Sequence, residues 1–199
     1  MSFTIRDGIG SGKEAKVTSD NRLSTTAVTE NEADTATSNG TRYNLNTGTV
    51  TLTNATTTTL FYIQNTEDKD LIITALIYNL GASTGGSGDV TVDIIRNPTA
   101  GDIITNANNI DINSNQNFGS NRSLSANIYK GATGETAVSG GETSISTLSA
   151  STTGRIFISL GAMTLAKGNS LAVNYTPPTG NTSQGIQVAV PCYVKTFDV

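Results

Sequence analysis

The amino-acid sequence predicts an all-β protein of the sandwich or barrel type. About ten short segments are rich in β-branched, aliphatic and aromatic residues, polar loops with turn chemistry separate them, and no segment has a convincing long helical pattern. The character of the chain also changes near residue 40. We therefore expect an extended N-terminal arm over residues 1–40 and a β-sandwich domain over residues 41–199.

The N-terminal segment has few large apolar residues, and glycines interrupt it. Alone it cannot bury enough surface to fold, so we expect it to be disordered or to become ordered on another surface. Its apolar residues Val17, Leu23 and Val28 suit strand pairing and are the candidate partner-binding residues. They lie in or beside three short pieces that look extended: Phe3–Arg6, Ala15–Thr18 and Leu23–Thr29.

A short helix is predicted at the end of this segment. The acidic residues of Glu30–Asp34 suit a first helical turn, and Thr29 is placed to cap it. The helix should end before Asn39 and Gly40, a pair that is typical of turns.

Two hairpins are predicted at the start of the sandwich. In the first, Tyr43–Leu45 and Thr49–Thr53 flank a tight turn in which Gly48 supplies the positive φ. In the second, Leu60–Gln64 and Leu71–Leu80 flank a polar run without any apolar residue.

The centre of the core is predicted in and after the second hairpin. Leu71–Leu80 is apolar nearly throughout, which is typical of a strand buried inside a sandwich. A buried helix is the competing interpretation, but the next strand alternates, with Val90, Val92 and Ile94 on one face. We expect the central core residues to be Leu71, Ile73, Leu76 and Ile77.

The second half of the chain continues the β pattern. Pro98 should end the third core strand, and the asparagine-rich loop after it holds only short pieces, Asp102–Thr105 and Asn109–Ile112. In the last strand, Pro191 indicates an edge or a bulge. Five more strands are predicted: Ser125–Tyr129, Thr143–Leu148, Gly154–Leu160, Ser170–Tyr175 and Gly185–Phe197.

Composition excludes several classes of function. Charged residues make up 14% and the formal net charge is −4, so no basic field exists to gather phosphates and we expect no nucleic-acid partner. No apolar run approaches the ~20 residues that span a bilayer, and the N-terminus lacks the apolar core of a signal peptide. We expect no membrane contact, synthesis in the cytoplasm, and release by lysis or within a particle.

The sequence offers no catalytic or cofactor site. It contains no histidine, which excludes Ser-His-Asp and Cys-His catalysis and histidine metal ligands. Carboxylate pairs remain available for hydrolysis, but Asp89, Asp93 and Asp102 form no convergent pattern. The single Cys192 lies in an apolar run and is expected to be a buried small hydrophobe.

Three further patterns have ordinary structural explanations. Asp111–Asn115 resembles the opening of a calcium loop, but Gln116 replaces the required glycine and Arg122 the closing glutamate, which favours a solvated loop with Asx turns. Gly8–Lys13 lacks the strand and spacing of a phosphate-binding loop, so a flexible linker is expected. The six tyrosines are spread through β runs and are expected in the core or in interfaces.

The chain resembles the capsid decoration, or cement, proteins of tailed bacteriophages. This resemblance covers most of the chain and contains no catalytic signature. The segments that carry it are Gly12–Leu23, Tyr43–Gly48, Asn65–Leu71, Gly86–Pro98, Asn117–Ser120 and Pro177–Ser183.

The resemblance implies a jelly-roll-like β-sandwich on the outer surface of a virion capsid, often as a homotrimer, with a terminal extension on the shell. The implied partner is the major capsid protein, and the implied function is to stabilise capsid subunits. The apolar run Ile186–Val194 is the expected source of interface residues. The alternative is a tail, baseplate or head-fibre module that binds a host-surface glycan, with an enzyme a distant third.

Overall fold

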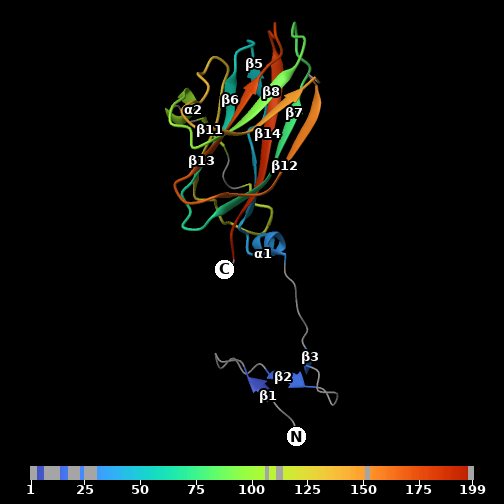
Figure 1. Cartoon of the computed structure of the whole chain (residues 1–199), viewed down its shortest axis with the longest axis vertical. Helices are drawn as coiled ribbons and strands as arrows, with labels where there is room; N and C mark the ends of the chain where they lie inside the picture. The colour runs from blue at the N-terminus through green and yellow to red at the C-terminus, as the bar shows by residue number, and fades with distance from the viewer. Residues whose placement is uncertain are drawn as a thin grey trace. The chain divides into compact units, whose positions relative to one another are not determined.

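The computed structural model describes residues 4–6, 14–17, 23–24, 31–105, 108–110, 114–150 and 153–196 (Figure 1). The chain forms two compact units, Met1–Asn31 and Glu32–Val199. The larger unit is built from two antiparallel sheets with few helical residues, which confirms the predicted all-β class. Its first element is a helix that begins at Glu32, so this unit starts earlier than the predicted domain boundary after residue 40.

The smaller unit contains three short strands: β1 (Thr4–Arg6), β2 (Glu14–Val17) and β3 (Leu23–Ser24). They form an antiparallel sheet in the order β1-β2-β3, and the backbone of Val17 lies opposite that of Leu23. The predicted extended pieces thus pair with one another, which the sequence did not indicate. Val28, the third candidate partner-binding residue, lies outside the described residues.

The larger unit contains a six-stranded sheet in the order β11-β8-β13-β6-β10-β9 and a second sheet in the order β12-β7-β14-β4, with β5 also paired to β14. Two short helices, α1 (Glu32–Ser38) and α2 (Asp102–Thr105), accompany the sheets. The strands are β4 (Arg42–Asn46), β5 (Val50–Leu52), β6 (Thr58–Asn65), β7 (Leu71–Leu80), β8 (Val90–Arg96), β9 (Asn108–Asn109), β10 (Ala126–Lys130), β11 (Glu142–Ser149), β12 (Gly154–Leu165), β13 (Ser170–Thr176) and β14 (Gln184–Val194).

The main strands pair in a nested order. The first pairs with the last, β4 with β14, and moving inward β6 pairs with β13, β7 with β12, and β8 with β11. All four pairs are antiparallel. Most strands that follow one another in sequence therefore lie in opposite sheets.

This order makes the predicted second hairpin wrong. β6 and β7 occupy different sheets and do not pair with each other. The connection Thr66–Asp70 instead crosses between the layers, which lie ~10 Å apart in β-sandwiches. The Asn65 side chain fixes the crossing, because its Nδ2 donates to the carbonyl oxygens of Lys69 (3.0 Å) and Leu165 (2.7 Å), and Leu165 ends β12 in the second sheet.

The predicted first hairpin is wrong as well. β4 and β5 both run antiparallel to β14, with Asn46 opposite Ala189 and Val50 opposite Ile186, so they are successive parts of one edge. Gly48 does adopt a positive φ of 63°, as predicted. It lies in a bulge that stays attached to β14, since the backbone N of Val188 donates to Oγ1 of Thr47 at 2.9 Å.

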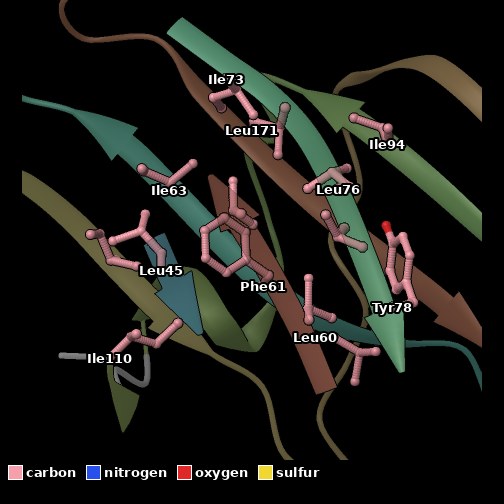
Figure 2. Packing of buried hydrophobic residues seen from close by; sticks show 14 of the residues in the cluster. Leu45, Leu60, Phe61, Ile63, Ile73, Leu76, Tyr78, Ile94, Ile110 and Leu171 are labelled. Atoms are coloured by element: carbon pink, nitrogen blue, oxygen red, sulfur yellow. The ribbon is translucent and has the colours of Figure 1, made fainter. Parts of the chain in front are cut away.

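Alternating apolar residues of both sheets fill the core between the layers. Figure 2 shows Ile73, Leu76 and Tyr78 of β7 in the same cluster as Phe61 and Ile63 of β6. The predicted core positions Leu71, Ile73 and Leu76 are fully buried. The alternation of β8 is confirmed too, with Val90, Val92 and Ile94 in this cluster.

Ile77 is a correction to the predicted core. It is only partly buried and does not belong to the main cluster, whereas its neighbours Leu76 and Tyr78 do. The side chains of adjacent residues in a strand point to opposite faces, so Ile77 lies on the outer face of its sheet. A long apolar run does not reveal which of its residues face inward.

Most side chains of the last strand, β14, are buried. The register of its pairing with β7 is interrupted around Pro191. Its pairing with β7 shifts between Ala189 and Cys192, which confirms the predicted bulge. Thr74 Oγ1 donates to the Pro191 carbonyl oxygen at 3.1 Å. Most of Ile186–Val194 is buried inside the unit, so this run does not supply the oligomer interface expected from the sequence.

A second, smaller apolar cluster covers the outer face of the six-stranded sheet. Ile103 of α2 and Val138 pack there against Tyr62, Ile95 and Ala172. The short piece Asp102–Thr105, expected within a loop, is thus a helical turn. Asp102 Oδ2 accepts a hydrogen bond from the backbone N of Thr136 at 2.7 Å, which ties the turn to the segment that carries Val138.

The buried tyrosines Tyr78 and Tyr175 make a matched pair for a stability prediction. Among the described residues the Tyr78 hydroxyl has no hydrogen-bond partner, whereas that of Tyr175 donates to Gln184 Oε1 at 2.9 Å. Tyr175→Phe should cost ~1 kcal/mol, while Tyr78→Phe should be neutral or stabilising by up to ~1 kcal/mol, because it removes a buried group without a partner. Urea unfolding would check this difference, and an equal loss in both variants would contradict it.

Candidate functional site

The candidate site lies at the end of the sandwich where α1 and the C-terminal end of β14 meet (Figure 1). Ala36 of α1 is fully buried in a small cluster with Ile72 and Tyr193. Glu32 fastens the start of the helix, since its Oε1 accepts from the backbone N of Thr196 at 3.1 Å. Burial, with a smaller effect of the Glu32 carboxylate, raises the pKa of Tyr193.

A tightly hydrogen-bonded loop lies beside α1. The buried Asn115 side chain donates through Nδ2 to the carbonyl oxygen of Gly40 at 2.6 Å, and its Oδ1 accepts from the backbone N of Asn117 at 2.8 Å. The Asn117 side chain in turn donates to the carbonyl oxygen of Ser38, the last residue of α1, at 3.2 Å. This loop is therefore fixed to the helix by side-chain amides.

The tip of this loop presents Phe118. A turn closes around it, with the backbone N of Ser120 donating to the Asn117 carbonyl oxygen at 2.9 Å and that of Gly119 to Asn117 Oδ1 at 3.1 Å. The Phe118 side chain is 100% exposed. A single exposed apolar side chain is common on protein surfaces, so Phe118 by itself does not define a contact surface.

A shallow cleft of about 680 Å³ opens at the same end. The cleft contains charged side chains of both signs, and Glu67 and Arg122 among them are hydrogen-bonded to backbone groups of the protein. Glu67 Oε1 accepts from the backbone N of Ser125 at 2.7 Å, and Arg122 donates to the Asn39 carbonyl oxygen at 3.4 Å. The lining residues are Asn39, Thr41, Tyr43, Glu67, Asp68, Lys69, Arg122, Ser123, Val194, Lys195 and Thr196.

The electrostatics of the cleft are those of ordinary surface pairs. A hydrogen bond from Lys167 to Asp68, 2.6 Å long, lowers the pKa of that carboxyl group. Burial raises the pKa of Tyr43, with a smaller contribution from the Glu67 carboxylate. In the part of the chain that the structure describes, no cluster of metal-ligating side chains occurs.

Two of the three acidic residues considered as catalytic candidates, Asp93 and Asp102, have separate partners. Asp93 of β8 accepts from Ser146 Oγ of the neighbouring β11, and Asp102 accepts from the backbone of Thr136. Of the predicted calcium-like pattern, residues 111–113 lie outside the described residues, while the Asn115 side chain binds backbone groups. The expected Asx turn is present at Asn115.

Sequence reasoning missed Phe118 and Asn115 as features of this end. The available signal was a large aromatic residue between Asn117 and Gly119, in a run otherwise typical of turns. The predicted partner-binding residues Val17 and Leu23 belong to the separate N-terminal unit, where their backbones pair.

Cys192 and Tyr175 in the core predict a loss of stability in alkali. Burial raises the pKa of Cys192 from 9.0 to about 12, and it raises the pKa of Tyr175 from 10.0 to about 12 against an opposing effect of Gln184. The unfolded chain loses the thiol proton above pH 9.0 and the tyrosine proton above pH 10.0, while the folded chain keeps both, so the free energy of unfolding falls as pH rises towards 12.

Each retained proton contributes a slope of about 1.4 kcal/mol per pH unit within this window. Urea unfolding at increasing pH measures the slope. Cys192→Ala should start less stable and decline less steeply, because it removes the thiol titration. A wild-type free energy of unfolding that stays constant across the window would contradict this account.

Comparisons with known proteins show no family. No known family matches the sequence, and no curated protein matches it. A solved aminopeptidase from the marine sediment archaeon Thaumarchaeota archaeon is similar over 69% of this chain and 25% of its own, with 16% identity and a TM-score of 0.26. The chain thus spans a quarter of that aminopeptidase.

A solved structure of tomato aspermy virus is similar over 80% of this chain and 82% of its own, with 11% identity and a TM-score of 0.26. Likenesses at this level carry no argument about fold or function. Neither helix of the sandwich, and no other helix in the described ranges, is long and apolar enough to cross a bilayer.

Proposed function

We propose that this chain is a structural protein of a tailed-phage virion, which decorates the outside of the capsid and holds neighbouring major capsid subunits together. The observation that carries the proposal is the division of the chain into a packed sandwich and a separate unit of short strands. Such a division suits a protein that presents one domain and attaches through another. The resemblance of the sequence to capsid decoration proteins supports the same assignment.

We assign the sandwich to the jelly-roll type. The nested pairing supports this assignment, because a jelly roll is a long antiparallel ribbon rolled so that its first and last strands pair. The eight main strands, with β5 continuing β4, fit this order. β9 and β10 are then an addition beside β6. Jelly rolls occur in capsid proteins, lectins and cupins, so the fold alone does not decide the function.

The N-terminal unit is the proposed attachment arm. Its strands can add to a sheet edge of the major capsid protein, where backbone hydrogen bonds supply affinity and side chains such as Val17, Leu23 and Val28 supply register. Ordering such a segment costs roughly 1–2 kcal/mol per residue, which pairing and burial on the capsid must offset. Three arms in a homotrimer would make the second and third contacts effectively intramolecular.

The proposal includes no catalysis, cofactor, nucleic acid or membrane. With a formal net charge of −4, the chain has no excess of positive charge to attract phosphates. The described carboxylates of the cleft bind protein groups, as shown by Glu67 with Ser125 and Asp68 with Lys167. The sequence is poor in charged residues, at 14%, and rich in Ser, Thr, Asn and Gly.

Copy number in purified virions tests the proposal. Quantitative gel or mass-spectrometric analysis should find this chain in a fixed ratio to the major capsid protein, and antibody labelling should cover the head. A few copies at the tail would overturn the proposal and would favour the glycan-binding tail module.

A further inference from the structure

One long side of the sandwich leaves its core incompletely covered. Its borders are the edge strands of the two sheets, β11 and β12, which follow each other in sequence. Apart from Leu165, which is buried at the end of β12, the apolar residues that these strands contribute to the main core remain only partly buried. They are Ile145 of β11 and Ile156, Ile158, Leu160 and Met163 of β12.

The opposite side of the sandwich is closed by the chain itself. The loop around Asn115 pairs with the outer edge of β4, since the backbone N of Asn44 donates to the Ser114 carbonyl oxygen at 2.8 Å. Ile110 and Leu124, on either side of this loop, are buried in the main core. The contrast shows that only the β11–β12 side, hereafter the open side, lacks a cover within the described part of the chain.

The open side also has the composition of a contact surface. Two of the three large apolar residues that are exposed in the described structure border it on the outer faces of its strands: Leu148 (67%), opposite Thr91, and Phe157 (60%), opposite Ile77. β11 and β12 carry a single charged side chain each, Glu142 and Arg155, and neither strand contains lysine or proline. Edge strands that face water are usually protected by such residues.

We propose that the open side is the surface through which copies of this chain associate, with β12 of one copy beside β11 of the next. The proposal deepens the self-association included in the proposed function and is independent of capsid attachment. A second copy suits this surface because two nearly neutral strips do not repel each other. A strongly charged partner would find almost no complementary charge there.

Strand direction supports this pairing. Ser149, at the end of β11, and Gly154, at the start of β12, lie opposite Val90 and Leu80 respectively, which bound one loop. β11 and β12 therefore run in opposite directions. Rotation about an axis parallel to the strands places β12 of one copy antiparallel to β11 of its neighbour. A closed ring of such contacts would leave neither edge free.

The same rotation brings the two exposed apolar residues together. It keeps every residue at its height along the axis, and Leu148 and Phe157 both lie near the Ser149 and Gly154 end of their strands. An overlap of about eight residues at ~3.3 Å each, across the width of a sandwich, buries roughly 1,000 Å² in total per contact. This area is near the lower limit for a specific interface, so association should depend on concentration.

Charge variants at Leu148 and Phe157 test the contact on the purified full-length chain without particles. Sedimentation should show an oligomer for the wild type. Leu148→Lys with Phe157→Lys places like charges across each contact, so this variant should sediment as a monomer. Leu148→Glu with Phe157→Lys places opposite charges there and should restore the oligomer at low salt. Phe118→Lys is the matched control, an exposed aromatic residue away from the open side.

Melting of each variant shows whether the sandwich remains folded, as expected for positions at least 60% exposed. A second measurement uses Leu148→Cys with Phe157→Cys and a short bis-maleimide. The native Cys192 is buried, so the introduced thiols react and should give covalent multimers. A monomeric wild type, an oligomer that survives the double lysine change, or a Glu-Lys variant that stays monomeric would each overturn the proposal.

Discussion

Replacement of Leu76 by Ala should lower the free energy of unfolding by about 2–5 kcal/mol. Leu76 is fully buried in the main core, between the two sheets, and shares its cluster with Ile73 and Tyr78 (Figure 2). The change removes apolar burial and leaves a cavity that the surrounding strands fill only in part. For a unit of this size the melting temperature should fall by roughly 4–20 °C.

Ile77 supplies the matched control on the same strand. Its side chain is partly exposed on the outer face of the sheet, so Ile77→Ala should cost less than about 1.5 kcal/mol. Thermal and urea unfolding of the two variants measure the difference. Equal losses for both residues would mean that the face of β7 that points inward has been misassigned.

The positions of the strands could be predicted because they depend on local patterns. Alternation identified β8 from Val90 to Arg96, and proline and glycine identified the ends of several others. The buried bulge at Pro191 followed from the missing backbone donor of proline. These features depend on residues close together in sequence, which one chain displays directly.

The arrangement of the strands could not be predicted in the same way. The pairs β4 with β14 and β6 with β13 join residues more than one hundred positions apart. A polar connection such as Thr66–Asp70 is compatible with a hairpin or with a crossing between sheets. The deciding contact is the bond from Asn65 to Leu165, which no local pattern indicates.

The candidate site was predicted only in part. The sequence indicated a loop rich in Asx turns, and Asn115 makes one. It did not indicate that the Asn115 side chain donates a hydrogen bond to the Gly40 carbonyl oxygen. It also did not indicate that the Phe118 side chain is fully exposed to solvent. The open side was missed for a related reason, since exposure of β11 and β12 depends on which strands lie at the sheet edges.

Deletion of Met1–Asn31 should abolish most of the binding to capsids while the sandwich stays folded. The compact unit begins at Glu32, which binds the backbone of Thr196. The melting temperature of Glu32–Val199 should therefore match that of the full chain. Deletion of Met1–Asn39 is the informative control, because it also removes Ala36 from its contacts with Ile72 and Tyr193 and should lower the melting temperature.

The most direct test of the account measures how much protein sediments with capsids that lack it, for the full-length chain and for Glu32–Val199 at equal concentrations. We expect saturable binding of the full chain to heads and little binding of the truncated chain. An excess of free full-length chain should compete with labelled full-length chain. Undiminished binding of the truncated chain would place the contact on the sandwich, and no binding by the full-length chain would contradict the proposed function itself.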